Sequence, residues 1–217
     1  MNLASYFDHS LLKPDCTKDA IQHLCQEAIE HKVKAVCIPP YYVNLAAKLL
    51  ENEAIKVATV IGFPLGYSTT FGKVEEIKRA INDGADELDV VINLAALKSG
   101  DWNVVQSDLD SMTTTTRLRS KTIKAIFETC LLTKEEMNRL CQICREVGVD
   151  FVKTSTGFNG PGADVEIIKS LKSNLQTSTI KVKASGGIRT AEDARLLIEA
   201  GADRLGCSAT VSILSNM

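Results

Sequence analysis

Three charged residues interrupt short β-branched segments that are otherwise typical of buried strands. They are Asp89, Lys153 and Lys183. Successive side chains of a strand point to opposite faces, and each charge lies opposite its apolar neighbours, as Asp89 does relative to Leu88 and Val90. Because an unpaired buried charge is costly, charges at such positions require an explanation.

The two lysines indicate one particular chemistry. Two ammonium groups held close together lower each other's pKa, and burial lowers it further. A lysine in that state is partly neutral near pH 7 and can attack a carbonyl carbon to form a Schiff base. The spacing does not say whether Lys153 or Lys183 is the nucleophile. A structural alternative is that both reach solvent at strand ends, or form an ion pair with Asp89 or Glu128.

Glycine-rich loops follow both lysine-bearing segments. Paired glycines come directly after the Lys183 segment, and a further glycine-rich loop follows the Lys153 segment. Such glycines let backbone N–H groups approach an anion closely, and a following helix N-terminus adds a favourable dipole. A tight strand–helix turn without a ligand would also use them. The predicted phosphate-binding residues are Gly157, Gly186, Gly187, Gly206 and Ser208.

The elements that must position these residues alternate along the whole chain. Amphipathic helical patterns separate the β-branched runs, and Thr17, Thr133 and Thr190 stand where helix N-caps are expected. Eight strand–helix units with no linker predict an α/β fold, a single (β/α)8 TIM barrel domain over residues 1–217, with an open doubly wound sheet as the alternative. The expected strands are residues 6–11, 34–38, 56–62, 87–93, 123–128, 151–155, 180–184 and 204–207.

A barrel would bring the charged residues and the glycine loops together. The strands that carry Lys153 and Lys183 would be neighbours, since only one helix separates them. Active sites of such barrels lie at the carboxyl ends of the strands, and phosphate is commonly held by the loops after the seventh and eighth strands.

Composition and charge exclude several classes of protein. The 217 residues are 45% hydrophobic and 24% charged, with a formal net charge of -2, which is typical of a soluble globular domain and offers no broad basic surface for nucleic acid. No apolar run approaches the ~20 residues of a membrane span, and no secretory signal is visible. Seven scattered cysteines argue against disulfides and for a reducing cytoplasm.

Metal and nucleotide sites lack support in the sequence. Cys141 and Cys144 match the C-x-x-C pattern, but they fall within a helical pattern and have no second cysteine pair, so no metal site is expected. No Walker A or G-x-G-x-x-G motif follows the first strand, so ATP and NAD are not expected as cofactors.

Six longer motifs in chain order are far more specific than any of these signals. With them the chain resembles the class I deoxyribose-phosphate aldolases over nearly its whole length. The motifs are DHSLLKP at residues 8–14, VIGFPLG at 60–66, ELDVVIN at 87–93, ETCLL at 128–132, FVKTSTGF at 151–158 and KASGGIRT at 183–190.

The resemblance implies both an activity and roles for residues. It implies a barrel that reversibly cleaves 2-deoxy-D-ribose 5-phosphate, a phosphosugar, into acetaldehyde and D-glyceraldehyde 3-phosphate in deoxyribonucleoside catabolism, with no metal or organic cofactor. Lys153 would be the Schiff-base lysine, Lys183 the second lysine that lowers its pKa, and Asp89 a partner of Lys183 and a water in proton transfer. The family also suggests a homodimer.

The chain departs from the family pattern in two places. Ala209 and Thr210 stand where the family often has a second small hydroxyl residue or glycine after Ser208, so side-chain phosphate contacts there are in doubt. The chain also stops at residues 215–217 without the Tyr-ended tail of some members, so we expect slower proton exchange on the enamine than in those members.

Two other functions compete with this one. A different Schiff-base or phosphate-binding barrel would act on another phosphosugar. A catalytically silent barrel would bind a phosphosugar as a regulator, but such a protein has no use for a coupled pair of lysines beside a carboxylate.

Overall fold

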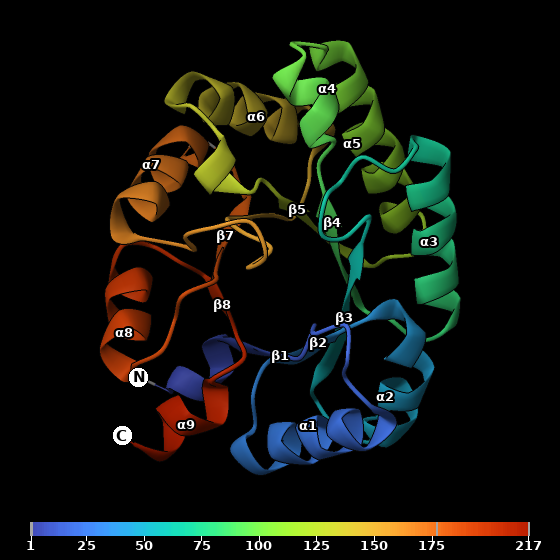
Figure 1. Cartoon of the computed structure of the whole chain (residues 1–217), viewed down its shortest axis with the longest axis vertical. Coiled ribbons are helices and arrows are strands. Elements are labelled where there is room, and N and C mark those ends of the chain that lie inside the picture. Colours follow the sequence, from blue (N-terminus) through green and yellow to red (C-terminus); the bar gives the residue numbers. More distant parts are fainter. Residues whose placement is uncertain (1, 177, 217) are drawn as a thin grey trace.

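Eight parallel strands close into a barrel in the computed structural model of the chain, which describes residues 2–176 and 178–216 (Figure 1). The strand order follows the chain, and the last strand pairs with the first. The predicted (β/α)8 barrel is therefore confirmed, and the open sheet is wrong. The strands are β1 (Phe7–Ser10), β2 (Ala35–Ile38), β3 (Lys56–Ile61), β4 (Glu87–Val91), β5 (Thr122–Ile126), β6 (Phe151–Lys153), β7 (Lys181–Ser185) and β8 (Arg204–Cys207).

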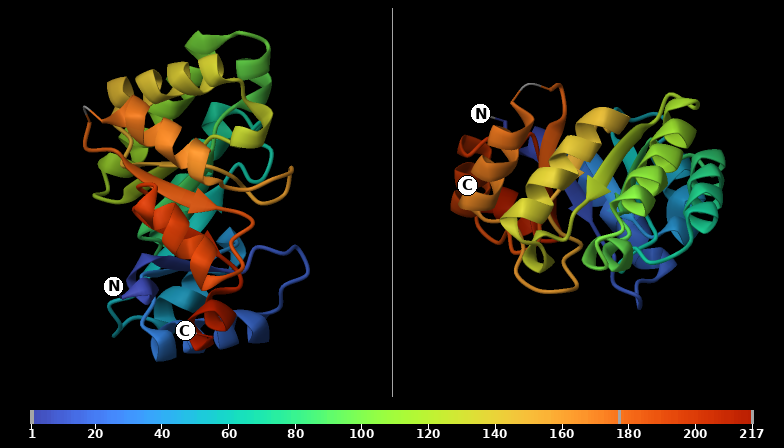
Figure 2. Two further views of the ribbon diagram at one scale, coloured as in Figure 1. Left: turned by 90° about the vertical axis from the view of Figure 1, so that its left-hand side faces the viewer. Right: turned by 90° about the horizontal axis from the view of Figure 1, so that it is seen from above.

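Helices surround the barrel on its outer face (Figures 1 and 2). The predicted N-caps at Thr17, Thr133 and Thr190 are confirmed, because each side chain accepts a hydrogen bond from a backbone N–H three residues later. Thr133 and Thr190 form complete capping boxes. The helices are α1 (Lys18–His31), α2 (Val43–Leu49), α3 (Thr70–Asn82), α4 (Leu94–Lys98), α5 (Trp102–Arg117), α6 (Lys134–Val147), α7 (Val165–Leu175), α8 (Ala191–Glu199) and α9 (Thr210–Ser215).

Five of the observed strands end one or two residues before their predicted carboxyl ends, whereas β2 and β8 end where predicted and β7 ends one residue later. β4 ends at Val91 rather than residue 93, and β6 ends at Lys153 rather than residue 155. After Lys153 the backbone turns into the loop that leads to α7, and the Ala163 N–H in that loop donates to the carbonyl of Ser185. The chain thus leaves the barrel soon after Lys153, which places the following glycine-rich loop at the barrel mouth.

Most of the apolar core lies between the strands and the helices. A second, much smaller apolar cluster, formed by Cys37, Ala58 and Val60, occupies one side of the barrel interior. The opposite side is filled by charged side chains from other strands, which are buried and pair with one another.

Strand register sets the height of the predicted site residues inside the barrel. Asp89 of β4 pairs with Lys124 of β5, and Lys153 of β6 pairs with Lys183 of β7. Side chains at paired positions of neighbouring strands project from the same face, so these four groups converge within the barrel.

No helix in the described part of the chain is long and apolar enough to cross a membrane. Met217, one of the three final residues discussed above in connection with a Tyr-ended tail, lies outside the described residues.

Candidate active site

A single carboxylate connects the lysines inside the barrel. The Nζ atoms of Lys153 and Lys183 each donate to Oδ2 of Asp89 at 2.8 Å. Asp89 and Lys183 are fully buried, and Lys153 is 3% exposed. The structure therefore brings together all three residues that the strand pattern selected, and Glu128 does not pair with either lysine.

The same cluster contains four residues that the sequence analysis did not assign to it. Lys124 donates to the other Asp89 oxygen, Oδ1, at 2.7 Å, and its Nζ lies 2.6 Å from Glu87. Asp8 accepts from Lys183 and, at 2.6 Å, from Arg204. Lys124 lies between Ile123 and Ala125, so the face alternation that singled out Lys153 would also have found it.

Asp89 and Lys183 are held in their ionised forms by the charges around them. Burial alone would lower the pKa of Lys183, but Asp8 and Asp89 raise it above its ordinary value. Burial would raise the pKa of Asp89, but Lys124, Lys153 and Lys183 bring it well below its ordinary value. The expectation that the lysine pair is partly neutral is therefore wrong for Lys183. Three carboxylates share this small volume with the cations and outweigh both burial and lysine–lysine repulsion.

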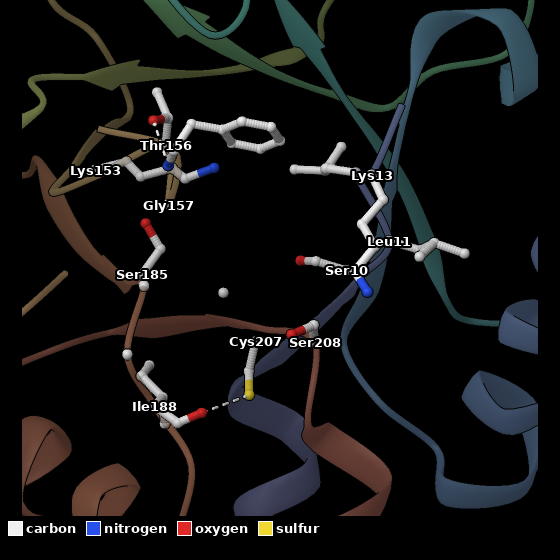
Figure 3. A pocket seen from close by; sticks show the side chains of 15 residues that line it. Ser10, Leu11, Lys13, Lys153, Thr156, Gly157, Ser185, Ile188, Cys207 and Ser208 are labelled. Atoms are coloured by element: carbon white, nitrogen blue, oxygen red, sulfur yellow. Dashed lines mark hydrogen bonds between the residues drawn. The ribbon is translucent and has the colours of Figure 1, made fainter. Parts of the chain in front are cut away.

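A cavity of about 410 Å³ opens above this cluster at the carboxyl ends of the strands (Figure 3). Lys153 reaches into it, whereas Lys183 and Asp89 lie beneath and do not line it. Figure 3 shows Lys153 on one wall and Ser10, Lys13 and Ser208 on the other. All five residues predicted to bind phosphate also line the cavity: Gly157, Gly186, Gly187, Gly206 and Ser208.

The paired glycines adopt a backbone that other residues rarely take. Gly186 and Gly187 have φ values of 83° and 80°, in the left-handed region, and a Cβ on Gly186 would lie 2.9 Å from the Cα of Gly162. Gly206 packs over a buried lysine, since a Cβ there would lie 3.0 Å from Cε of Lys183. These positions let the backbone pass close to a ligand and to the cluster below it.

Glu128 fixes the loop that carries Gly157. Its carboxylate accepts from the backbone N–H of Thr156 at 3.1 Å, from the Thr156 hydroxyl, and from Nδ2 of Asn159 at 2.8 Å. Glu128 is 1% exposed, and its own backbone is left-handed, with φ of 54°. The residue belongs to a motif quoted from the sequence, but its role in anchoring this loop was not predicted.

The described residues contain no group of three or more His, Cys, Asp or Glu side chains arranged to hold a metal ion. Cys141 and Cys144 lie buried in α6, and His9 pairs with Glu27 at 3.0 Å on the helix side of β1.

A closed parallel barrel with a lysine-lined cavity at the carboxyl ends of its strands defines the class of protein: a (β/α)8 enzyme with its active site at that end of the barrel. Comparison with known proteins narrows the class further. The model of the DeoC/LacD family of aldolases matches residues 3–214, and the chain belongs to that family.

Curated and solved relatives agree with this assignment. A deoxyribose-phosphate aldolase of Desulfitobacterium hafniense is 50% identical over 215 residues, which cover 99% of this chain and 98% of the relative. The crystal structure of a putative deoxyribose-phosphate aldolase from Coccidioides immitis superposes with a TM-score of 0.96 at 40% identity, covering 99% of this chain and 85% of that one. The deoxyribose phosphate aldolase of Aeropyrum pernix, described as tetrameric, gives 0.92 at 33% identity, covering 99% and 90%.

Proposed function

We propose that this aldolase reversibly cleaves 2-deoxy-D-ribose 5-phosphate to acetaldehyde and D-glyceraldehyde 3-phosphate through a Schiff base on Lys153. The name deoxyribose-phosphate aldolase belongs to relatives that match almost every residue of the chain. The observation that carries the covalent mechanism is the position of Lys153, which alone among the described strand lysines reaches the cavity. Lys183 is sealed beneath Gly206 and is not accessible to a sugar carbon.

The products identify the bond that breaks. Acetaldehyde contains C1 and C2 of the open-chain sugar, so cleavage falls between C2 and C3. The neutral amine of Lys153 adds to C1, and loss of water gives an iminium ion. The C2–C3 electron pair then moves toward the iminium nitrogen as the C3 hydroxyl loses its proton. The glyceraldehyde 3-phosphate leaves, and an enamine remains on Lys153.

The carboxylate and the second lysine handle protons. Protonation of the enamine at C2 restores an iminium ion, and addition of water releases acetaldehyde and the free lysine. Asp89 is ionised and can accept a proton, and Lys183, whose pKa is raised by Asp8 and Asp89, is protonated and can donate one. Since neither side chain lines the cavity, we assign these transfers to a path through Lys153 and a water.

The glycine loops hold the phosphate end of the substrate. Gly157, Gly186, Gly187, Gly206 and Ser208 surround the cavity, and its volume of about 410 Å³ suits a small phosphosugar. With the phosphate bound to these residues, C1 of the open-chain sugar is held at a fixed position, so that the carbonyl carbon lies next to Lys153.

The remaining proposals concern organisation and location. We assign residues 1–217 to one aldolase domain, because strands from both ends of the chain complete the same barrel. We propose a homodimer in the cytoplasm; the seven cysteines are free thiols, as expected in a reducing compartment. Light scattering after size exclusion tests the dimer, and a monomer or a tetramer would contradict it.

Borohydride trapping tests the covalent mechanism. The protein is reduced with borohydride in the presence of deoxyribose 5-phosphate or acetaldehyde, and its peptides are mapped by mass. We expect a reduced adduct on the peptide that carries Lys153, and its loss in Lys153→Ala. An adduct on Lys183 would reverse the assignment of the two lysines, and a folded protein with no adduct would favour the regulatory barrel. Turnover of another phosphosugar instead of deoxyribose 5-phosphate would contradict the substrate.

A further inference from the structure

The phosphate wall of the cavity supplies hydrogen-bond donors but little positive charge. A phosphate monoester carries between one and two negative charges near pH 7. The predicted phosphate ligands are four glycines and one serine, whose N–H and hydroxyl groups are neutral donors. A buried or half-buried dianion gains much more from a cation than from neutral donors alone.

The helix that follows the paired glycines does not supply the missing charge. In α8, the capping box occupies the first turn: the Asp193 N–H donates to Thr190, and the Asp193 carboxylate accepts from the N–H groups of Arg189 and Thr190. That carboxylate offsets the positive end of the helix dipole. The helix after Ser208, α9, has six residues.

The other cations of the barrel are not available to pair with the substrate phosphate. Lys153 is bonded to Asp89 and, in the proposed reaction, to C1 of the sugar. Lys124 and Lys183 are fully buried beneath the cavity. Arg189 follows the paired glycines but does not line the cavity.

Lys13 lies where the counter-charge is needed. It belongs to the loop after β1 and lines the cavity. Asp8 and His9 of β1 pair with Gly206 and Cys207 of β8, so this loop rises beside the loop that carries Ser208. In Figure 3 the Lys13 side chain extends along the wall toward Ser208, across the cavity from Lys153.

The Lys13 ammonium group makes no hydrogen bond or ion pair with any residue in 2–176 or 178–216. We propose that Lys13 is the counter-charge of the substrate phosphate and sets the preference for phosphorylated over unphosphorylated deoxyribose. This inference rests on the proposed function and deepens it, because it assigns a specificity residue to that site.

The test compares Lys13→Met and Lys13→Arg with the wild-type enzyme on deoxyribose 5-phosphate and on 2-deoxyribose. Methionine keeps the length of the side chain without its charge, and arginine keeps the charge. Lys18→Met is the matched control, since Lys18 is an exposed lysine five residues away that does not line the cavity. Inhibition by inorganic phosphate is measured for each variant.

Loss of a charged hydrogen bond predicts that Lys13→Met lowers kcat/KM for deoxyribose 5-phosphate by about 10- to 100-fold. We expect the loss mainly in KM, with kcat/KM for 2-deoxyribose unchanged and inhibition by phosphate weakened. Lys13→Arg should retain most of the preference, and Lys18→Met should match the wild type. Equal losses on both sugars, or no loss, would overturn the role of Lys13.

Failure of the proposed function gives a different result. In that case the wild-type protein itself would not cleave deoxyribose 5-phosphate. Calorimetric titration with inorganic phosphate would then still decide the inference: weaker binding to Lys13→Met than to the wild type supports it, and equal binding contradicts it.

Discussion

Lys153 and Lys183 donate to the same atom, since each Nζ lies 2.8 Å from Oδ2 of Asp89. One carboxylate oxygen thus joins the lysine that reaches the cavity to the lysine sealed beneath it. A change in the charge of Lys153, such as the loss of its proton before attack, is transmitted directly to the Asp89–Lys183 pair. This contact gives the proposed proton transfers a physical connection to the reacting carbon.

Asp89→Asn should abolish most of the activity. The amide keeps the shape of the carboxylate but cannot accept a proton, so kcat for deoxyribose 5-phosphate is expected to fall by about 10²- to 10⁴-fold. The change also leaves three buried lysines short of a counter-charge, at a cost of about 3–5 kcal/mol in the free energy of unfolding.

Asp108→Asn is the matched control for Asp89→Asn. Asp108 forms a fully buried ion pair with Lys73 at 2.8 Å, between α3 and α5 and outside the barrel interior. Asp108→Asn should lower the free energy of unfolding, measured by urea denaturation, by about as much as Asp89→Asn does. Its kcat should stay near that of the wild type. Comparable kcat values for the two variants would rule out a special role of Asp89.

Acid should destabilise the enzyme through Asp8. Burial would raise the pKa of Asp8, but Lys183, Lys124 and Arg204 lower it below its ordinary value of 3.8. A carboxyl whose pKa is lowered by folding contributes stability that is complete above its unfolded pKa of about 3.9, and that is lost as the pH falls toward the folded value.

Urea midpoints between pH 7 and pH 2.5 measure this loss. The wild-type midpoint should fall steeply below about pH 4, where the unfolded carboxyls take up protons. Asp8→Asn should be less stable at pH 7 and should lose less on acidification. Parallel curves for the two proteins would show that Asp8 does not contribute to the pH dependence.

Glu128→Gln should loosen the loop that carries Gly157. The amide oxygen can replace one acceptor, but its NH₂ group faces the donors of Thr156 and Asn159. We expect KM for deoxyribose 5-phosphate to rise severalfold and proteolysis within residues 154–163 to accelerate. Glu136→Gln, which weakens the capping box of α6, is the control and should leave both unchanged.

Most of the seven thiols should be inert in the folded protein. Burial raises the pKa of Cys25 to about 11 and that of Cys141 to about 12. A thiol reagent at pH 8 should label only the half-buried Cys16 and Cys130 quickly, and all seven cysteines in guanidinium. Rapid labelling of Cys141 or Cys144 in the native protein would favour a redox function for their C-x-x-C pattern.

The sequence was sufficient to predict the barrel because its signals are local. β-Branched runs, helix caps and the alternation of faces depend on neighbouring residues, and the eight strands follow them. Asp89, Lys153 and Lys183 were found in the same way. Lys124 carried the same signal, whereas Lys13 and Glu128 lie in or beside loops, where no periodicity says which way a side chain points.

The protonation state of Lys183 could not be predicted from strand pattern. Its partners Asp8 and Asp89 come from strands 175 and 94 residues away. The pKa of Lys183 depends on burial, attraction and repulsion together, and these depend on distances that exist only after the barrel closes. The sequence therefore indicated the two lysines but not the carboxylates that keep Lys183 charged.

The charges of the cluster inside the barrel divide by sign along the chain. The carboxylates of Asp8, Glu87 and Asp89 all precede the exposed Gly100, and the four cations all follow it: Lys124, Lys153, Lys183 and Arg204. Two half-barrels separated at Gly100 would therefore present an acidic and a basic inner surface to each other. The ion pairs between the two fragments would then favour their association. Recovery of aldol cleavage would show that the fragments have recombined.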